Sequence, residues 1–331
     1  MPRQILFIAK GFDDPSTRYR ALQYDHLFAA HGWQLSCLVD RGSWLQRWAI
    51  LQKARKADAV VIVRRTYSYP FLLLLRLVAR HLVFDFDDAV FCKSNGGPSR
   101  RRYKGFIRTV SRCDQVWAGN NYLAAEARRC NQQVIVVPTS VFPASYEKSV
   151  EKKDKGLELV WIGSQSTRKH LLTIIPLLED LAQTVSGLRL KIIADFTLQS
   201  DRLEVAAVAW SEAVEAQELL SADIGLAPLP DNAYTRGKCA LKVLQYMAAE
   251  LPVISSAVGV NKEVVVDGAT GYVAENDWDW SQAVIRLAKK KSLRQTMGRA
   301  GREQFLQNFS APLVFQKILA SLERGLGGGA K

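Results

Sequence analysis

Lysines and a glycine of the C-terminal half could bind a phosphate group. A polar loop with Gly237 leads to a helix predicted over 239–250, with Lys238 at its start and Lys242 one turn further on the same face. Free N–H groups at a helix start attract anions, and a glycine lets the backbone approach a phosphate closely. A helix start contributes about 0.3–1 kcal/mol, whereas a cation about 4 Å from a phosphate contributes roughly 4 kcal/mol at an effective dielectric of about 20. Binding of a diphosphate therefore depends on side-chain cations.

Two more loops of this half could contribute to the same site. The predicted strand 157–163 leads into Gly163-Ser164-Gln-Ser-Thr-Arg168-Lys169-His170, and the predicted strand 252–258 leads into Gly259-Val260-Asn261-Lys-Glu263. Because the carboxyl ends of parallel strands meet at one edge of a sheet, we expect these loops to face one cleft. Singly, the lysines could be solvated helix surface and the glycines ordinary turns. Together they indicate a diphosphate site.

Polar residues also follow strands predicted in the N-terminal half. The first strand leads into a loop from Gly11 to Arg18, and Gly119-Asn120 follows the run 115–119. Asp85-Phe-Asp87-Asp88 ends the run 82–86, and D-x-D carboxylates can hold Mn²⁺ or Mg²⁺ against a diphosphate. Since nearby lysines can already neutralise a phosphate, we predict no metal site and favour a substrate contact or a structural cap for these acids. An ordinary surface loop is the alternative for 11–18.

Short apolar runs must position these loops. They are β-rich, continuous and separated by 15–25 residues, which indicates buried parallel strands with crossover helices. The sequence therefore predicts an α/β chain of two Rossmann-like, doubly wound domains facing a cleft. We expect an N-terminal domain over 1–150, a C-terminal domain over 151–310, and a helix with a flexible tail over 311–331, with a charged connection over 145–158. The runs are 5–9, 35–39, 59–63, 82–86, 115–119 and 134–138, then 157–163, 188–194, 205–210, 223–229 and 252–258, with helices over 170–186, 213–221, 239–250 and 279–290 in the second half.

The net charge of +13 is concentrated in the N-terminal half. Residues 1–150 hold 23 Lys or Arg against 11 Asp or Glu, and residues 151–331 hold 22 against 21. Such asymmetry favours an anionic partner. The run 99–112 predicts an amphipathic helix whose basic face suits an anionic membrane, with Trp44, Leu45 and Trp48 as an interfacial anchor. A packed helix with solvated charges is the alternative.

Composition excludes several other classes. The five cysteines are scattered and form no C-x-x-C pair, which indicates reduced thiols of a cytosolic protein. The first apolar run is too short for a signal peptide, and the apolar stretch 70–84 is too short to span a bilayer, so it is predicted to be a helix running into a strand. The four histidines lack the spacing of metal hydrolases or deaminases.

Taken together, the motifs across 157–275 resemble the glycosyl transferases group 1 family of the GT-B fold, which are retaining enzymes with nucleotide-sugar donors. These motifs are W-I-G-S, A-D-I-G-L-A-P-L, G-K-C-A-L-K-V-L-Q-Y-M-A-A-x-x-P-V-I, G-V-N-K-E and D-G-A-T-G-Y. The resemblance extends more weakly to the N-terminal half through S-T-R-Y-R, D-F-D-D, G-N-N-Y-L and P-T. It implies an enzyme that moves a hexose-type sugar from a nucleotide-diphosphate sugar to an acceptor without a cofactor. From the basic N-terminal half we expect a glycan or lipid-linked acceptor of cell-envelope, lipopolysaccharide or exopolysaccharide biosynthesis. We also expect a cytoplasmic location, peripheral at the membrane.

The resemblance also implies roles for individual residues. It assigns the donor diphosphate to the loop with Arg168 and Lys169, and the predicted helix face adds Lys242, so these three are the expected catalytic cations. Acceptor contacts are expected at Gly11, Arg18, Asp87, Asp88 and Asn120. Donor contacts fall on Gly163, Ser164, Gly237, Lys238, Gln245, Gly259, Val260, Asn261 and Glu263. The family's two donor-binding glutamates, eight residues apart, correspond to Gly237 and Gln245. Gln245 can still bind ribose hydroxyls, whereas Gly237 cannot replace a carboxylate. The G-K-C-x-x-K variant resembles a recurring subgroup.

Three other classes compete with this interpretation. A non-catalytic, glycosyltransferase-like partner subunit is the strongest rival because of Gly237. A Rossmann dehydrogenase is disfavoured because no G-x-G-x-x-G follows a strand and the first loop, A-K-G-F-D-D-P, is acidic. A nucleic-acid-binding protein is suggested by charge alone, and no recognisable module or set of base-stacking aromatics accompanies that charge.

Overall fold

The chain is divided into two compact units in the computed structural model, which describes residues 1–147 and 156–327. The N-terminal unit comprises Met1–Ser140, Asn232–Cys239 and the segment that begins at Ala311, and the C-terminal unit comprises Val141–Asp231 and Ala240–Ser310. The sequence predicted a domain boundary near residue 150 and a separate helix with a tail over 311–331. In the structure, the short segment 232–239 and the C-terminal helix both join the N-terminal unit. Most of the predicted connection, 148–155, and the predicted tail beyond 327 lie outside the described residues.

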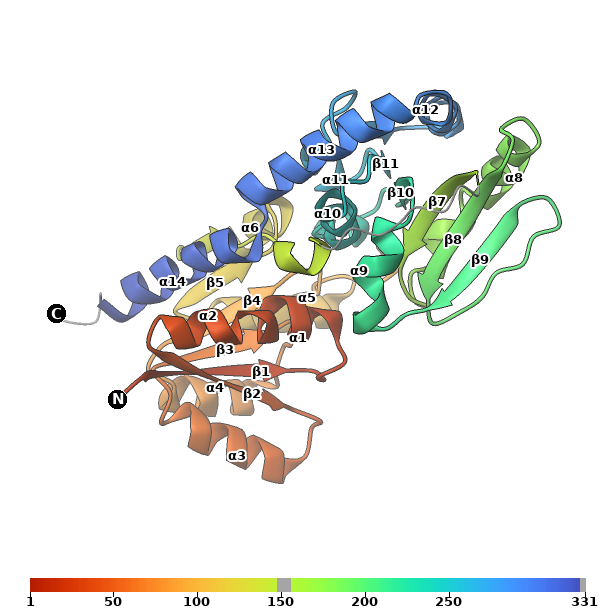
Figure 1. Cartoon of the computed structure of the whole chain (residues 1–331). Coiled ribbons are helices and arrows are strands. Elements are labelled where there is room, and N and C mark those ends of the chain that lie inside the picture. The colour runs from red at the N-terminus through yellow and green to blue at the C-terminus, as the bar shows by residue number, and fades with distance from the viewer. Residues whose placement is uncertain (148–155, 328–331) are drawn as a thin grey trace. The chain divides into compact units, whose positions relative to one another are not determined.

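A parallel sheet of six strands forms the centre of the N-terminal unit, in the order β2-β1-β3-β4-β5-β6 (Figure 1). Its central strands are buried along their length because helices cover both faces. Each strand begins within two residues of a predicted apolar run. The strands are β1 (Arg3–Ala9), β2 (Trp33–Val39), β3 (Ala59–Val63), β4 (Leu82–Phe86), β5 (Gln115–Ala118) and β6 (Val134–Val136).

The helices of this unit lie on both faces of its sheet. Because parallel crossovers are right-handed, α3 to α6 cover one face, and α1 and α2 cover the other. The first face carries α3 (Trp44–Ala54), α4 (Tyr69–Val78), α5 (Arg100–Val110) and α6 (Asn121–Arg128). The remaining elements are α1 (Pro15–Arg20), η1 (Leu22–Tyr24), α2 (Asp25–Ala30), η3 (Thr235–Gly237) and α14 (Ala311–Gly327). Thus 70–84 is mostly a helix followed by a strand, as predicted, and no helix among the described residues is long and apolar enough to cross a membrane.

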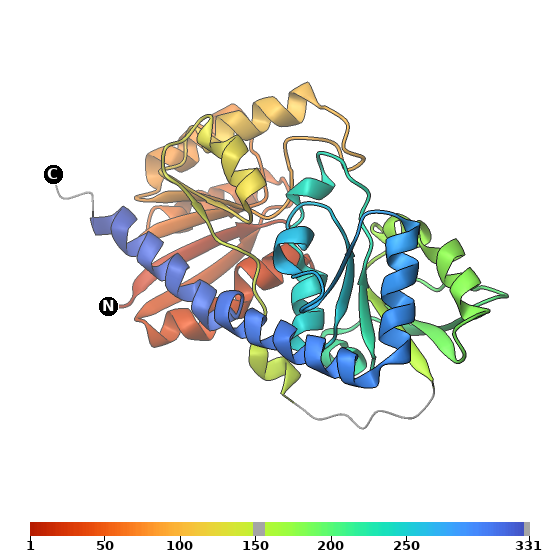
Figure 2. The same ribbon diagram turned by 90° about the horizontal axis from the view of Figure 1, so that it is seen from above.

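The last helix, α14, packs on the N-terminal unit with α2, as Figure 2 shows for the blue helix beside the red elements. The Phe315 ring lies edge-on to Phe28, with centroids 4.9 Å apart. The buried Trp117 indole donates a hydrogen bond to the Ser321 hydroxyl at 3.0 Å. The amphipathic pattern at the C-terminus therefore belongs to a helix that completes the first domain.

His81 is buried and packs closely against α14, so we expect the stability of this contact to depend on pH. A Cβ atom at Gly325 would lie 2.4 Å from His81 Cε1, so the imidazole touches this helix closely. Burial lowers the pKa of His81 below its ordinary value of 6.5, although Asp114 opposes the shift. The unfolded chain then takes up a proton more readily, so we expect the free energy of unfolding to fall as the pH drops below about 6.5. Urea unfolding across this range should show a slope that His81→Phe removes. Exposed His26→Phe is the control, and an unchanged slope in His81→Phe would contradict the assignment.

The C-terminal unit is built on a second parallel sheet, in the order β12-β11-β10-β7-β8-β9. Two doubly wound parallel sheets confirm the predicted α/β class. The strands are β7 (Leu157–Ile162), β8 (Leu188–Ala194), β9 (Glu204–Ala209), β10 (Ile224–Ala227), β11 (Val253–Ser256) and β12 (Gly271–Ala274). The helical elements are η2 (Pro143–Tyr146), α7 (Arg168–Leu172), α8 (Ile175–Ala182), α9 (Glu212–Leu220), α10 (Leu241–Ala248), α11 (Asn261–Val264), α12 (Asp277–Lys289) and α13 (Lys291–Asn308).

The contact of α10 with its sheet depends on a glycine. A Cβ atom at Gly225 in β10 would lie 2.3 Å from the Tyr246 ring of α10. The Tyr246 hydroxyl accepts a hydrogen bond from the Ile162 N–H at 3.1 Å and donates one to the Leu226 carbonyl at 3.0 Å. This buried tyrosine therefore fixes α10 against β7 and β10, whose carboxyl ends carry the predicted site loops.

Candidate functional site

A buried tryptophan supports the loop after β7 in the C-terminal unit. The Trp161 side chain is fully buried. A Cβ atom at Gly163 would lie 2.2 Å from Trp161 Cη2, so only glycine allows the loop to pass this close to the indole. The Ser164 N–H donates to the Thr167 hydroxyl at 3.0 Å, which closes the loop ahead of α7. The loop backbone is therefore fixed in place by local contacts.

Trp161 also brings the second predicted cation segment to this loop. Lys242, in the first turn of α10, places Nζ over the Trp161 ring, 4.3 Å from its centroid. Arg168, at the start of α7, lies over the Phe196 ring at 5.5 Å, and Phe196 is 5.8 Å from Trp161. Nε of Arg168 is buried without a hydrogen-bond partner among the described residues. Two predicted catalytic cations thus meet around one aromatic pair.

The other predicted donor residues of this unit lie on α10 and at α11. Gln245 is buried on α10, and Asn261 is buried with its side-chain amide 3.4 Å from the Ala227 carbonyl at the end of β10. Gly259 has φ of +52°, a left-handed turn that leads through Val260 into the four-residue helix α11. Glu263 and Lys169 are exposed. The assignment of Glu263 to donor binding and of Lys169 to catalysis stays a prediction.

Gly237 and Lys238 lie in the N-terminal unit. The predicted helix was expected to carry Lys238 and Lys242 on one face, but α10 begins only at Leu241, and Lys238 is extended. The helix-face prediction is therefore wrong. Left-handed Ala240, with φ of +56°, separates the two lysines and turns the chain between the units.

Lys238 is held by Asp88, an acid that the sequence assigned to the acceptor side. Its Nζ lies 2.9 Å from Asp88 Oδ1 and 4.8 Å from the centroid of the Tyr234 ring. The Tyr234 hydroxyl donates to Asp88 at 3.3 Å, and Asn120 donates to the Lys238 carbonyl at 3.1 Å. Burial tends to lower the pKa of Lys238, but Asp88 and Tyr234 together raise it above its ordinary value. Lys238 therefore stays charged and links the segment 232–239 to the end of β4.

The carboxylates of the D-x-D-D sequence are paired with cations. Arg20 makes a bidentate ion pair with buried Asp85, with Nε 2.9 Å from Oδ2. Arg64 contacts Asp88 and lies 3.4 Å from Asp87. Among the described residues, no group of three or more His, Cys, Asp or Glu side chains is arranged to hold a metal ion. The geometry of these acids is that of an ion-pair network.

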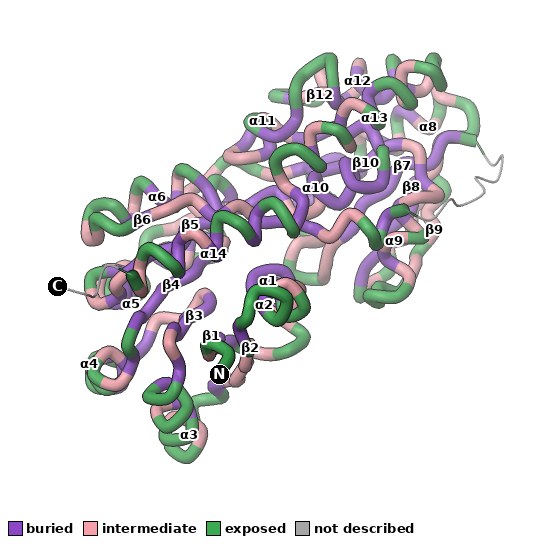
Figure 3. Tube along the Cα trace, turned by 60° about the vertical axis from the view of Figure 1, so that its left-hand side comes forward, coloured by how far each residue is buried: buried purple, intermediate pink, exposed green. Residues whose placement is uncertain are grey.

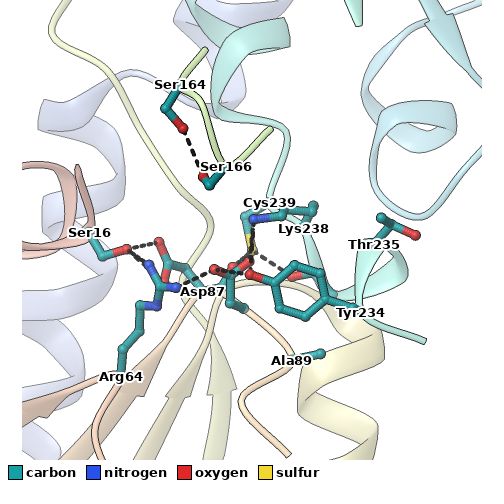
Figure 4. Close-up of polar contacts among 12 residues, drawn as sticks. Ser16, Arg64, Asp87, Ala89, Ser164, Ser166, Tyr234, Thr235, Lys238 and Cys239 are labelled. Carbon is teal, nitrogen blue, oxygen red and sulfur yellow. Dashed lines mark hydrogen bonds and ion pairs between the residues drawn. The ribbon is translucent and has the colours of Figure 1, made fainter. Parts of the chain in front are cut away.

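Arg64 is the centre of this network, and the sequence analysis missed it. Its guanidinium also reaches Asp14 at 3.6 Å and donates to the Ser16 hydroxyl, which in turn donates to Asp87 at 2.9 Å (Figure 4). Burial tends to lower the pKa of Arg64, but Asp87, Asp88 and Asp14 together raise it. Its backbone is left-handed, with φ of +55°, a conformation that is costly for any residue that has a Cβ atom. The position of Arg64 directly after β3, at the carboxyl edge of the sheet, was the feature of the sequence that could have identified it.

The loop from Gly11 to Arg18, which follows β1, lies beside this ion-pair network. Gly11 and Arg18 are half-buried, and the Arg18 guanidinium lies over the Tyr19 ring at 4.8 Å. Asp14 caps α1 by accepting the Ser16 N–H at 2.9 Å. The network around Arg64 therefore holds this loop, the end of β4 and the segment 232–239 together within the N-terminal unit.

The C-terminal unit contains a pocket of about 440 Å³. It is lined by the loops after β10, β11 and β12 and by the start of α12, including Asp231, Glu275 and Asp277. None of the predicted donor residues lines it. Its acidic walls do not suit a phosphate.

Gly237 is required by the close approach of its segment to Ala89. A Cβ atom at Gly237 would lie 2.8 Å from the Ala89 backbone nitrogen and 3.1 Å from Leu123 Cδ2. We expect Gly237→Glu, which introduces the family's acid, to lower the free energy of unfolding by about 1–3 kcal/mol. Urea unfolding measures this loss. Gly327→Glu is the control, because a Cβ there meets nothing within 4 Å. Equal stability of the two variants would show that the segment can move aside.

Comparison with known proteins gives a family match and a fold. Residues 150–290 match the family model of glycosyl transferases group 1, so the chain contains a domain of this kind. An uncharacterized glycosyltransferase from Methanocaldococcus jannaschii is 39% identical over 66 residues, which are 19% of this chain and 18% of that protein. The matched curated relatives are covered over 17–22% of their own length.

Two solved structures are similar over almost the whole chain. HepE from Anabaena, in complex with UDP and glucose, has a TM-score of 0.68 at 13% identity, and the match covers 97% of this chain and 99% of that one. WaaG, a glycosyltransferase involved in lipopolysaccharide biosynthesis, has a TM-score of 0.70 at 15% identity, and the match covers 98% and 100%. At such low identity these similarities establish the fold, which is GT-B.

Proposed function

We propose that the protein is a glycosyltransferase that moves a sugar, of the hexose type, from a nucleoside-diphosphate sugar to an acceptor. The observation that carries this proposal is the arrangement around Trp161. The glycine loop after β7, the guanidinium of Arg168 and the ammonium of Lys242 meet there, inside the segment that matches the family model. The UDP bound to HepE supports a nucleoside diphosphate as the donor's leaving group.

Catalysis would consist of positioning and of electrostatic stabilisation. Arg168, Lys169 and Lys242 would stabilise the negative charge that develops on the departing diphosphate. We propose transfer with retention of configuration, in which the leaving phosphate takes the proton of the acceptor hydroxyl, so no side chain is assigned as general base. The remaining donor contacts would come from the Gly163–Ser164 loop, Gln245 and the α11 start.

The acceptor would lie against the N-terminal unit. Asp87 keeps 15% of its side chain exposed, and Gly11 and Arg18 are half-buried, so these residues can contact a second substrate. Asp88 and Asn120 would act indirectly, because they hold the segment 232–239. We propose a glycan or lipid-linked acceptor of envelope polysaccharide biosynthesis, which the similarity to WaaG and the basic N-terminal half support.

We propose that the reaction uses no resident metal or cofactor. The pairing of Asp85 with Arg20, and of Asp87 and Asp88 with Arg64, supports this view, because these carboxylates are already neutralised. We also propose a cytoplasmic location, which rests on the odd number and the scattered positions of the cysteines in the sequence.

A second candidate function is that of a non-catalytic, glycosyltransferase-like partner subunit. Two observations favour it. Gly237 stands where the family has a glutamate and is packed against Ala89, and Lys238 is occupied by Asp88. A chain that binds the donor without turning it over would have these features.

Calorimetric titration with UDP, GDP, ADP and CMP, with and without EDTA, tests the proposal. We expect selective binding of one diphosphate, unchanged by EDTA, followed by sugar release from the matching nucleotide sugar. Binding without turnover in the presence of candidate acceptors would favour the partner subunit. Absence of binding to the whole panel would overturn the donor site.

A further inference from the structure

Bulky apolar side chains are exposed on two neighbouring helices of the N-terminal unit. On α3, Trp44 is 74% exposed, Leu45 is 60% exposed and Trp48 is 59% exposed. On α4, Leu77 is 80% exposed and Leu74 is 49% exposed. Figure 3 shows that α3 presents a largely exposed surface. Exposed apolar side chains that cluster on one surface mark an interaction site, whereas singly scattered ones do not.

These helices form one layer with α5 on the same face of the sheet. The Arg47 guanidinium of α3 lies over the Phe71 ring of α4 at 5.0 Å. Arg112, just after α5, donates to the Tyr69 hydroxyl of α4 at 2.9 Å and stacks over its ring at 5.4 Å. We call this layer the α3–α5 face. Its apolar and basic parts are held side by side by cation–π contacts.

The α3–α5 face is strongly basic. The helices α3, α4 and α5 contain no Asp or Glu. Between residues 41 and 84 the only acid is Asp58, and Arg80 pairs with it at 2.8 Å. The Lys and Arg residues of the three helices are Arg47, Lys53, Arg76, Arg100, Arg101, Arg102, Lys104 and Arg108. Of these, Arg47 pairs with Asp40 at 3.5 Å and Arg76 pairs with Asp114 at 2.7 Å, so the charge of the face comes mainly from α5.

The helix α5 contributes charge, whereas α3 contributes the apolar anchor. The sequence predicted α5 as an amphipathic membrane helix, but its apolar residues Phe106 and Val110 are fully buried in the core. Its exposed residues include Arg100, Arg101 and Lys104. The exposed tryptophans lie on α3 instead, and tryptophan is the residue that favours the boundary between headgroups and acyl chains.

We propose that the α3–α5 face binds the surface of an anionic phospholipid membrane. Trp44, Leu45 and Trp48 enter the interface, and the α5 cations contact lipid phosphates. A second copy of the chain is a poorer occupant, because a symmetric contact would set this basic face against itself. This inference rests on the proposed function in one respect, because a membrane-bound enzyme would meet a lipid-linked acceptor at the membrane surface. Membrane binding itself does not require catalysis, so the two can be tested separately.

Flotation of the full-length protein with lipid vesicles tests the proposal. We expect binding to phosphatidylcholine vesicles that contain phosphatidylglycerol, loss of that binding at high salt, and little binding to phosphatidylcholine alone. The double variant Trp44→Ser/Trp48→Ser should lower the partition coefficient at least about tenfold. Arg100→Gln/Arg101→Gln/Lys104→Gln should lower it about a hundredfold, since each cation near the surface contributes a factor of about five.

Matched controls lie in the C-terminal unit. Trp278→Ser removes a tryptophan that is 65% exposed on α12, and Lys289→Gln/Lys290→Gln removes two exposed cations. These variants should bind vesicles as the parent does. The proposal is overturned if the parent ignores anionic vesicles at low salt, or if the tryptophan variant changes oligomeric state in gel filtration while it keeps vesicle binding. Nucleotide binding measured on the same variants separates this failure from failure of the donor site.

Discussion

Arg168→Ala and Lys242→Ala are each expected to weaken binding of the matching nucleoside diphosphate about 10- to 100-fold. Each substitution removes a charge-assisted contact to a phosphate, for which about 1.5–3 kcal/mol is typical. The double variant should lose measurable binding, because the helix start and loop backbone alone supply about 1 kcal/mol. Calorimetric titration measures the affinities, and circular dichroism shows that the variants are folded.

The control for this experiment is a cation with similar packing outside the site. Arg286 of α12 lies over the Tyr272 ring at 5.9 Å, much as Arg168 lies over Phe196. Arg286→Ala should leave nucleotide affinity unchanged. If Arg168→Ala and Lys242→Ala bind nucleotide as tightly as Arg286→Ala does, the phosphate site around Trp161 is wrong.

Asp88→Ala is expected to lower the free energy of unfolding by about 3 kcal/mol. The Asp88 side chain is only 7% exposed and neutralises both Arg64 and Lys238. Its removal leaves two partly buried cations close to each other without this partner, and loss of one member of a buried pair costs about 3–5 kcal/mol. The lower end of that range applies because Arg64 and Lys238 are each more than a quarter exposed. Urea unfolding measures the change.

An exposed ion pair provides the comparison. Asp180 and Arg202 lie 2.5 Å apart with side chains 71% and 52% exposed, so Asp180→Ala should cost at most about 1 kcal/mol. The double variant Asp88→Ala/Lys238→Met should recover part of the loss, because it removes one unpaired charge. A cost for Asp88→Ala no larger than that for Asp180→Ala would mean that the segment 232–239 is held by other contacts.

The sequence by itself determined the two parallel sheets and the loops at their carboxyl ends. Continuous apolar runs such as 59–63 and 157–163 specify buried strands, because burial on both faces leaves no room for alternation with polar residues. Gly163 and Arg168 could be placed on a loop after a strand for the same reason. The strands and the loops that follow them depend on residues that are close together in the chain, so the order of apolar and polar residues is enough to predict them.

Only the tertiary structure decided which charges meet. Lys238 and Asp88 are 150 residues apart, and Lys238 pairs with this acid because a left-handed turn at Ala240 separates 232–239 from α10. The attachment of α14 to the N-terminal unit likewise depends on the shape of Phe28 and Phe315, which no local pattern specifies. Long-range ion pairs and helix docking follow from where the folded backbone brings distant groups, so they appear only once the whole chain is packed.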